Sequence, residues 1–327
     1  MVVLSDVDKR ILYELGVDAR QSYKSLARNI GSKKEVVAYR INQLLKKGVI
    51  KKFVPVFSLY KLNIFASKIY LRLHGLSKES EEELYDYLLN NPHIVWVAKC
   101  VGHWDLLLGM YTKNIVDFAR KKHEILSRFS EYIMGYDITQ LEDGLVFNRD
   151  YLINRDLSYR KEFTFGGEVD KLELSSIDLN ILKEIKDNAR FQVVELGKKF
   201  GLDSRTVLRK IKGFEKNGLI QGYTVFIDLN KIGMRLNKLC IYLSKYDDED
   251  INRLISFIKF HPNTIHLIKS LGSWELEVET ENEGDAYGLI MELKNNFPDV
   301  IKQINLVTIT DEMKLDFFPE DDSLFNT

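Results

Sequence analysis

The sequence predicts an α+β protein of two tandem units, each a winged helix-turn-helix followed by a βαββαβ ferredoxin-like domain. The first observation is a repeat: Leu4–Trp104 matches Leu174–Trp274 at a constant offset of 170, and Asp143 matches Asp311 at an offset of 168. The second is that the hydrophobic period changes from helical to strand-like at corresponding points of both copies. The third is that both helical segments are basic and the segments after them are acidic.

These changes of pattern divide the chain into domains. We expect a first winged helix-turn-helix at 1–57, a first ferredoxin-like domain at 58–150, a linker at 151–173, a second winged helix-turn-helix at 174–230, a second ferredoxin-like domain at 231–320 and a tail at 321–327. At about 3.3 Å per residue the linker can span up to roughly 75 Å. Its length therefore does not dictate which copy packs on which.

The first winged helix-turn-helix is predicted from helical spacing of apolar residues. Helices are expected at about 4–15, 22–30 and 33–47. Ser5 is placed to cap the first helix, and Ser32 with Glu35 has the S-x-x-E spacing of a capping box for the third. Lys51 and Lys52 then fall in the wing.

The second winged helix-turn-helix centres on Gly201–Tyr223. Helices are expected near 176–186, 193–200 and 203–216, with Asp203 as the cap of the last. Gly218 follows that helix, where a left-handed residue ends many helices. The β-branched and aromatic run from Leu219 to Phe226 predicts a strand pair or wing.

After each wing the pattern predicts the order βαββαβ. In the first copy the elements are expected at 66–73, 79–90, 94–101, 104–111, 115–129 and 132–141. In the second they are expected at 238–243, 250–260, 264–271, 274–279, 285–297 and 300–310.

Composition is that of a soluble globular protein, with 45% hydrophobic and 29% charged residues. No apolar run approaches the roughly 18 residues that a membrane helix needs, and the N-terminus lacks a signal peptide's apolar core, so we expect a cytoplasmic protein without membrane contact. Cys100 and Cys240 do not correspond between the copies, which argues against a structural disulfide or a metal site.

The net charge of −1 conceals opposite local charges. Residues 1–57 carry a net charge of +7 and residues 174–230 carry +3, whereas residues 231–327 carry −8. A polyanion would be attracted to the helix-turn-helix segments and repelled by the acidic segment that comes after the second one. Chance variation of surface charge is the alternative explanation, and the agreement in both copies argues against it.

The order of motifs resembles the Lrp/AsnC family of prokaryotic regulators over nearly the whole chain, twice. Each motif is modest alone, and their duplication in order makes them specific. The matching segments are L-S-x-[VI]-D-x-x-I-L with A-R at Leu4–Arg20 and Leu174–Arg190, G-x-x-x-x-x-V-x-x-[RK]-I from Gly31 and from Gly201, and the turns Gly102–Asp105 and Gly272–Glu275.

The resemblance implies a protein that binds promoter DNA as a dimer and self-associates through its ferredoxin-like domains, which this family calls RAM domains. Most members have one copy per chain, so this tandem form is expected to be a built-in pseudo-dimer, of a kind more typical of archaea. Many members sense amino acids or related metabolites at interfaces lined by the G-x-x-D turn.

That turn supplies the predicted effector-binding residues: Gly102, Asp105, Gly272 and Glu275. A glycine lets backbone N–H groups approach a ligand carboxylate, and an acid three residues later can meet an α-ammonium group. The alternative is a tight turn with a core tryptophan and a solvent-facing acid. Glu275 departs from the family's aspartate, which puts the second site in doubt.

The predicted DNA-binding residues lie on the exposed faces of the two recognition helices and in the first wing. They are Lys33, Lys34, Tyr39, Arg40, Lys51, Lys52, Ser204, Arg205, Arg209 and Lys210. A solvated basic helix face is the alternative. Because the two faces differ in sequence, we expect a non-palindromic operator in double-stranded DNA.

No nucleotide-binding, hydrolase or redox motif is found, and the six histidines lack metal spacing. The sequence therefore predicts no catalytic residues, no metal, no cofactor and no enzymatic function. Two alternatives stay open. One is a sensor or interaction module with a vestigial DNA-binding half, and the other is a haem-pathway decarboxylase, since some of those resemble the same two-domain architecture.

Overall fold

The computed structural model describes residues 1–153, 157, 160, 162–169 and 172–325. Parts of the predicted linker and the last two residues of the predicted tail lie outside the described residues. The described helices include none that is long and apolar enough to cross a membrane.

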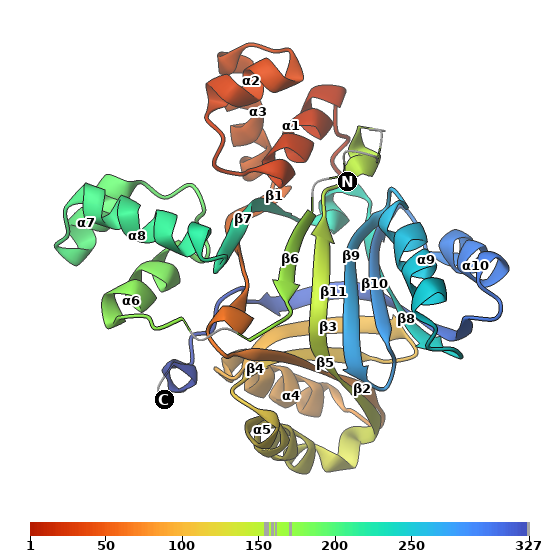
Figure 1. Ribbon diagram of the computed structural model, residues 1–327. Coiled ribbons are helices and arrows are strands. Elements are labelled where there is room, and N and C mark those ends of the chain that lie inside the picture. The colour runs from red at the N-terminus through yellow and green to blue at the C-terminus, as the bar shows by residue number, and fades with distance from the viewer. Residues whose placement is uncertain (154–156, 158–159, 161, 170–171, 326–327) are drawn as a thin grey trace.

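Both helix-turn-helix domains form as expected, and each is followed by one strand (Figure 1). The first contains α1 (Asp6–Val17), α2 (Tyr23–Ile30), α3 (Lys34–Lys46) and β1 (Ile50–Phe57). The second contains α6 (Ser176–Ile185), α7 (Val193–Phe200), α8 (Ser204–Lys216) and β7 (Ile220–Ile227).

Helix caps explain most of these boundaries. The Ser5 hydroxyl accepts the backbone N–H of Asp8 and forms a reciprocal capping box, and the Asp203 carboxylate accepts the N–H of Arg205 at 2.8 Å. The expected box between Ser32 and Glu35 is wrong, because α3 begins one residue later. The Ser32 N–H instead donates to an α2 carbonyl oxygen and closes that helix's Schellman turn.

The two strands that follow the recognition helices pair with each other rather than each forming a hairpin wing. β1 and β7 run antiparallel, with Phe53 opposite Val225 and Val54 opposite Thr224. A lone strand would leave a row of N–H and C=O groups unpaired, and the other copy supplies the partners. We call this two-stranded element the ribbon.

The two ferredoxin-like domains merge into one closed ring of strands. The first contributes β2 (Phe65–Leu73), β3 (Ile94–Gly102), β4 (Leu106–Thr112) and β5 (Ile133–Phe147), with α4 (Lys78–Asn90) and α5 (Ile115–Arg128). The second contributes β8 (Arg235–Leu243), β9 (Thr264–Gly272), β10 (Leu276–Asn282) and β11 (Ile301–Leu315), with α9 (Asp248–Lys259) and α10 (Tyr287–Asn296).

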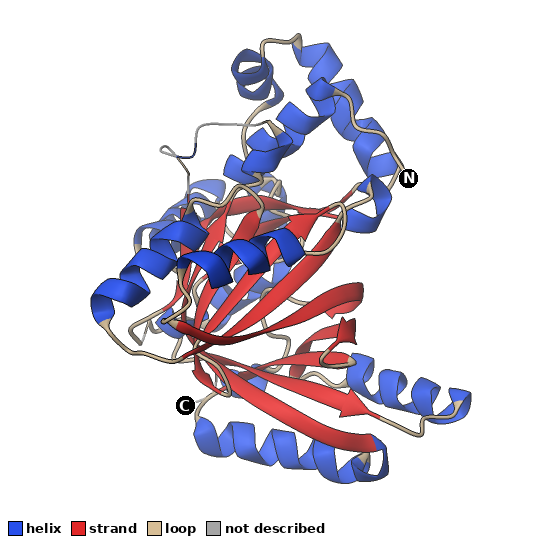
Figure 2. Ribbon diagram, turned by 90° about the vertical axis from the view of Figure 1, so that its right-hand side faces the viewer, coloured by secondary structure: helices blue, strands red, loops and turns tan. Residues whose placement is uncertain are grey.

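The strand order is β2-β4-β3-β11-β8-β10-β9-β5, and a β2–β5 pairing closes it. The junctions between the copies are β3–β11 and β5–β9, which are equivalent under the repeat. Closure removes the free edges that each four-stranded sheet would have. The four helices lie outside this barrel (Figures 1 and 2).

The barrel interior is built around two tryptophans from equivalent turns. Trp104 and Trp274 are fully buried with ring centroids 4.9 Å apart, and Tyr70 contacts both. The outward-facing residues of the same strands pack on the helices as separate cores. The pairing of the units therefore occurs within one chain.

The predicted linker contains a strand that the sequence analysis did not expect. β6 (Glu162–Gly166) pairs antiparallel with the end of β5 and adds a ninth strand to the sheet. Its Phe163 ring lies against Gly222 of the ribbon, where a side chain of any size would collide with it. The linker thus joins the barrel to the ribbon. Short 3-10 turns lie at Leu59–Lys61, Ser130–Tyr132, Asp150–Leu152, Leu229–Ile232 and Asp322–Leu324.

Candidate nucleic-acid interface and inner cavity

The recognition helices α3 and α8 present several of the predicted DNA-binding side chains to solvent. Lys33, Lys34 and Tyr39 are exposed in the first copy, and Arg205 and Arg209 are exposed in the second. Ser204, the first residue of α8, is half-buried. These positions are free to meet the edges of bases or phosphates, which is the geometry that a recognition helix requires.

Two other predicted residues have partners inside their own domains. Arg40 lies 3.5 Å from the carboxylate of Asp8, and the equivalent Lys210 lies 2.7 Å from Asp178. Both pairs fix the recognition helix to the first helix of its domain. Burial opposes ionisation of Asp178, but hydrogen bonds from Lys210 and Ser175 outweigh it and lower the pKa of that carboxyl.

The two lysines expected in the wing lie on the ribbon. Lys52 is 2.5 Å from Asp187 in the other helix-turn-helix domain, and Lys51 is 3.9 Å from Asp228. Their ammonium groups also lie over the rings of Phe317 and Phe226, respectively. Both lysines therefore hold the two copies together, because β1 pairs with β7 instead of forming a separate wing.

Reciprocal hydrogen bonds join the two helix-turn-helix domains. The Arg20 guanidinium donates to the carbonyl oxygen of Ala189 at 2.6 Å, and Arg190 donates to that of Ala19 at 2.7 Å. The Arg20 group also lies 3.9 Å from the centroid of the Phe191 ring. This exchange of equivalent contacts is what a two-fold axis produces in a homodimer. The chain is therefore a pseudo-dimer.

The predicted effector turns have a structural role at the barrel junctions. A Cβ on Gly102 would lie 2.5 Å from a β11 carbonyl oxygen, and one on Gly272 would lie 2.3 Å from a β5 carbonyl oxygen. Asp105 accepts the backbone N–H of Leu73 at 2.8 Å, and Glu275 accepts that of Leu243 at 2.9 Å. The longer Glu275 reaches the equivalent N–H, so the substitution conserves this contact.

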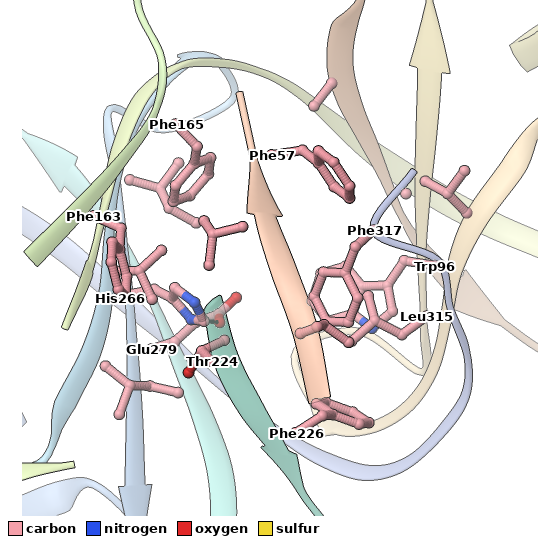
Figure 3. A pocket seen from close by; sticks show the side chains of 18 of the residues that line it. Phe57, Trp96, Phe163, Phe165, Thr224, Phe226, His266, Glu279, Leu315 and Phe317 are labelled. Carbon is pink, nitrogen blue, oxygen red and sulfur yellow. Dashed lines mark hydrogen bonds and ion pairs between the residues drawn. The ribbon is translucent and has the colours of Figure 1, made fainter. Parts of the chain in front are cut away.

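A cavity of about 300 Å³ lies between the ribbon and the barrel. Its lining is mainly aromatic and aliphatic, with side chains from the ribbon, from β6 and from the inner face of the barrel (Figure 3). The sequence pattern gave no sign of this cavity. A cavity of this size falls at the lower end of the range for small-molecule sites.

The barrel encloses a cluster of buried charges, of which Lys68 and Glu279 line this cavity. Lys238 lies 2.8 Å from Glu277 and 2.7 Å from Glu279, and Lys68, the equivalent of Lys238 in the first copy, lies 2.5 Å from Glu277. Burial opposes ionisation of Glu277, but the attraction of Lys238 and Lys68 dominates and lowers its pKa to about 2. Glu277 is therefore ionised at neutral pH.

An ion pair and a hydrogen-bonded histidine border the cavity. Arg149 donates two hydrogen bonds to Glu281 at 2.8 and 2.9 Å, and the Nδ1 atom of His266 lies 2.6 Å from Glu279. The bidentate geometry between Arg149 and Glu281 is among the stronger kinds of protein ion pair. The Arg149 guanidinium is therefore already bound to a carboxylate of the protein, and the His266 ring is hydrogen-bonded to another.

The acids of this charge cluster and of the Arg149 ion pair belong to the second copy only. Glu277, Glu279 and Glu281 alternate along β10, whereas the equivalent residues of β4 are Leu107, Gly109 and Tyr111. The signal in the sequence was this alternation of acids with apolar residues. An exposed sheet face gives the same alternation, so the pattern alone did not reveal that the acids point into a barrel.

Fold and interface together define a protein with two DNA-binding domains. The sequence model for winged helix-turn-helix DNA-binding domains matches residues 4–51 and 174–221. The chain is 31% identical to the uncharacterised HTH-type transcriptional regulator PH1916 of Pyrococcus horikoshii over 119 residues, which are 36% of this chain and 79% of that one. It is 34% identical to the regulator LrpC of Bacillus subtilis over 92 residues, 28% of this chain and 62% of LrpC.

The chain therefore belongs to the Lrp/AsnC family of transcriptional regulators. It is a tandem member, because both halves carry the helix-turn-helix domain and both contribute to one barrel.

One expectation from the sequence needs correction. The crystal structure of the siroheme decarboxylase NirDL resembles this chain over 98% of its length and 96% of the enzyme's, with a TM-score of 0.63 and 13% identity. The prediction that the chain has no enzymatic function is contradicted by this likeness, because an enzyme shares the whole two-unit fold. The absence of familiar catalytic motifs did not separate regulators from enzymes of this architecture.

Proposed function

We propose that the protein is a sequence-specific regulator that reads a non-palindromic operator with two unlike recognition helices. The observation that carries this proposal is the exchange of contacts between Arg20 and Ala189 and between Arg190 and Ala19. It fixes two different helix-turn-helix domains in one chain, so that each molecule offers one α3 and one α8. A homodimer would instead offer two copies of the same helix.

The exposed residues of the two helices differ in chemistry. The first helix offers lysines and a tyrosine at its exposed positions, whereas the second offers Arg205 and Arg209. Arginine reads guanine with two hydrogen bonds, whereas lysine more often holds a phosphate. We infer that the second half-site is the more guanine-dependent one, and that Arg40 and Lys210 orient their helices through Asp8 and Asp178.

The test is a selection of random duplexes by the purified protein, followed by sequencing of the retained DNA. An asymmetric motif with two unlike halves about one helical turn apart, or a multiple of it, is the expected result. Binding should weaken steeply with salt because phosphate contacts release counterions. A palindromic motif would contradict the unlike half-sites, and no enrichment at low salt would contradict DNA reading and favour a sensor module.

We also propose that a small metabolite modulates DNA binding. The turn residues Gly102, Asp105, Gly272 and Glu275 stay candidates for an amino-acid site, although the carboxylates of Asp105 and Glu275 already accept backbone N–H groups at 2.8 and 2.9 Å.

Both barrel junctions are filled within the chain, so further self-association must use other surfaces of these domains. Light scattering with and without amino acids would measure that assembly.

A second candidate is tetrapyrrole chemistry in the inner cavity. The observation that favours it is a cavity within a fold that a siroheme decarboxylase shares over its whole length. Sirohaem carries several carboxylates, and the lysine and the arginine that line this cavity, Lys68 and Arg149, are already paired with glutamates. Titration with sirohaem would decide: a shifted Soret band and release of carbon dioxide support the enzyme, and an unchanged spectrum excludes this substrate.

A further inference from the structure

We propose that the cavity between the ribbon and the barrel binds an organic cation, a molecule with an apolar body and one ammonium group, and that Glu312 receives the ammonium. The role of the cavity as an effector site rests on the proposed DNA-binding function, whereas binding of the cation itself does not depend on that function.

Aromatic side chains line the cavity on several sides. Phe57 and Phe226 come from the two strands of the ribbon, Phe163 and Phe165 come from β6, and Trp96 comes from the barrel (Figure 3). Such walls favour an apolar body by burial and favour a cation by attraction to the ring faces.

Of the described carboxylates that line the cavity, Glu312 is the one without an ion pair. Lys68, Lys238 and Arg149 are paired with Glu277, Glu279 and Glu281. Among the described residues Glu312, on β11, forms no ion pair, and its hydrogen bond comes from the Trp96 indole at 3.2 Å. Glu312 therefore lines the cavity with capacity for a cationic donor.

The surroundings of Glu312 favour that role. Burial, followed by repulsion from Glu279, raises the pKa of Glu312 to about 7. The other charged or titratable groups at the cavity are Lys51 from β1, Lys68 from β2, Arg149 after β5, His266 from β9, Glu281 from β10 and Asp316 after β11. A bound ammonium would stabilise the ionised form of Glu312 and displace its proton.

The repeat does not reproduce this site. The position in β5 that corresponds to Glu312 is Gly144, and the Phe165 ring lies so close to it that a Cβ would meet the ring at 2.5 Å. A carboxylate there would displace the aromatic wall. The geometry points to one cation site per chain, on one side of the pseudo-two-fold axis.

Matched probes test the charge requirement. Tryptamine, its neutral analogue tryptophol and its anionic analogue indole-3-propionate share the indole body and differ in the terminal group, and phenethylamine with 2-phenylethanol repeats the comparison on a smaller body. Isothermal titration of the full chain without DNA is expected to show at least about tenfold tighter binding of the amines than of the alcohols, and no binding of the anion.

Two variants locate the site. Glu312→Gln keeps the shape and removes the charge, and it is expected to weaken amine binding about tenfold while leaving the alcohols unchanged. Glu283→Gln, the same change at an exposed position, is the control and should bind like wild type. Affinity for tryptamine should rise between pH 5.5 and 8 in wild type, because Glu312 ionises in that range, and this rise should be lost in Glu312→Gln.

Equal affinities for tryptamine and tryptophol would overturn the proposal, as would no detectable amine binding up to about 10 mM. These ligand comparisons use wild-type protein, so they decide even if Glu312→Gln fails to fold. Because DNA is absent, failure here leaves DNA reading intact, and failure of the duplex selection leaves the cation site intact. If both hold, tryptamine should change operator affinity, since the cavity walls β1 and β7 continue from α3 and α8.

Discussion

The Arg20 side chain donates to the main-chain oxygen of Ala189, which is 169 residues away in the chain and 2.6 Å away in space. The same arginine lies over the ring of Phe191, so one side chain links two helix-turn-helix domains by a hydrogen bond and a cation–π contact. Its repeat equivalent, Arg190, donates to the main-chain oxygen of Ala19 and lies over the ring of Tyr23, so it links the domains in the other direction. The relative position of the recognition helices depends on this pair.

Replacing Arg20 by alanine should therefore loosen the pairing of the two domains. A hydrogen bond from a charged group contributes about 1.5–3 kcal/mol, so we expect the free energy of unfolding to fall by about that amount. Affinity for a duplex with both half-sites should fall, whereas affinity for a single half-site should hold. Urea denaturation and fluorescence anisotropy measure the two effects. Arg10→Ala, at an exposed position of α1, is the control, and equal losses in both variants would refute the interpretation.

The two recognition helices should be separable by mutation. Lys33→Ala with Lys34→Ala should relax one half of the operator, and Arg205→Ala with Arg209→Ala should relax the other. Each lost phosphate contact should reduce the slope of log affinity against log salt by about 0.9. Lys302→Ala, exposed on β11, should leave the slope unchanged. If the arginine variant binds like wild type, the second helix is a vestigial half.

The glycine of the second turn should be required for barrel closure. Gly272 has a φ of +148°, and a Cβ there would lie 2.3 Å from the carbonyl oxygen of Ile138 on β5. Gly272→Ala is expected to cost about 2–4 kcal/mol of unfolding free energy through backbone strain and steric overlap. Gly284→Ala, exposed with open space around it, should stay within about 0.5 kcal/mol. Similar melting temperatures for the two variants would show that the junction tolerates the side chain.

Acid should destabilise the barrel through Glu277. Its pKa is about 2 in the folded protein and 4.5 ordinarily, so its contribution to stability is complete above pH 4.5 and is lost as the pH falls toward 2. Glu277→Gln should destabilise at neutral pH by about 3–5 kcal/mol, because Lys68 and Lys238 lose a buried partner. Thermal melting from pH 7 to pH 2 measures both, with Glu283→Gln as the control. A melting curve of Glu277→Gln that equals that of wild type at pH 7 would contradict this account.

The sequence predicted where the helices and strands lie better than it predicted which of them pack or pair with one another. The offset of 170 between the copies and the change of hydrophobic period located the helices and most strands of both units, because these depend on local spacing. Ala19-Arg20 and its repeat were visible as a motif, but their role depends on contacts between the copies. The ribbon and the barrel junctions likewise join segments that the linker length left free to pair in several ways.

The candidate site was predicted only in part. The exposure of the lysines and arginines on the recognition helices was predicted, because helix periodicity shows which face is polar. That they contact DNA stays a prediction. The inner cavity was missed, because Glu277, Glu279 and Glu281 read as the polar face of a half-exposed strand until closure of the barrel turns that face inward. β6 was missed because its five residues lie in a segment without a repeat equivalent.

Fusion of the two units also determines whether the subunits that form the barrel can be exchanged. In a homodimer each junction forms between separate molecules, and a related subunit is able to replace one of them. Here both junctions, β3–β11 and β5–β9, are closed within one chain, so this pairing does not depend on protein concentration and these two junctions are not open to a related subunit. The sequence of each half can consequently change without affecting the fit to a separate subunit. The repeat-equivalent positions of β10 and β4 differ in this way, because they are acidic in β10 and uncharged in β4.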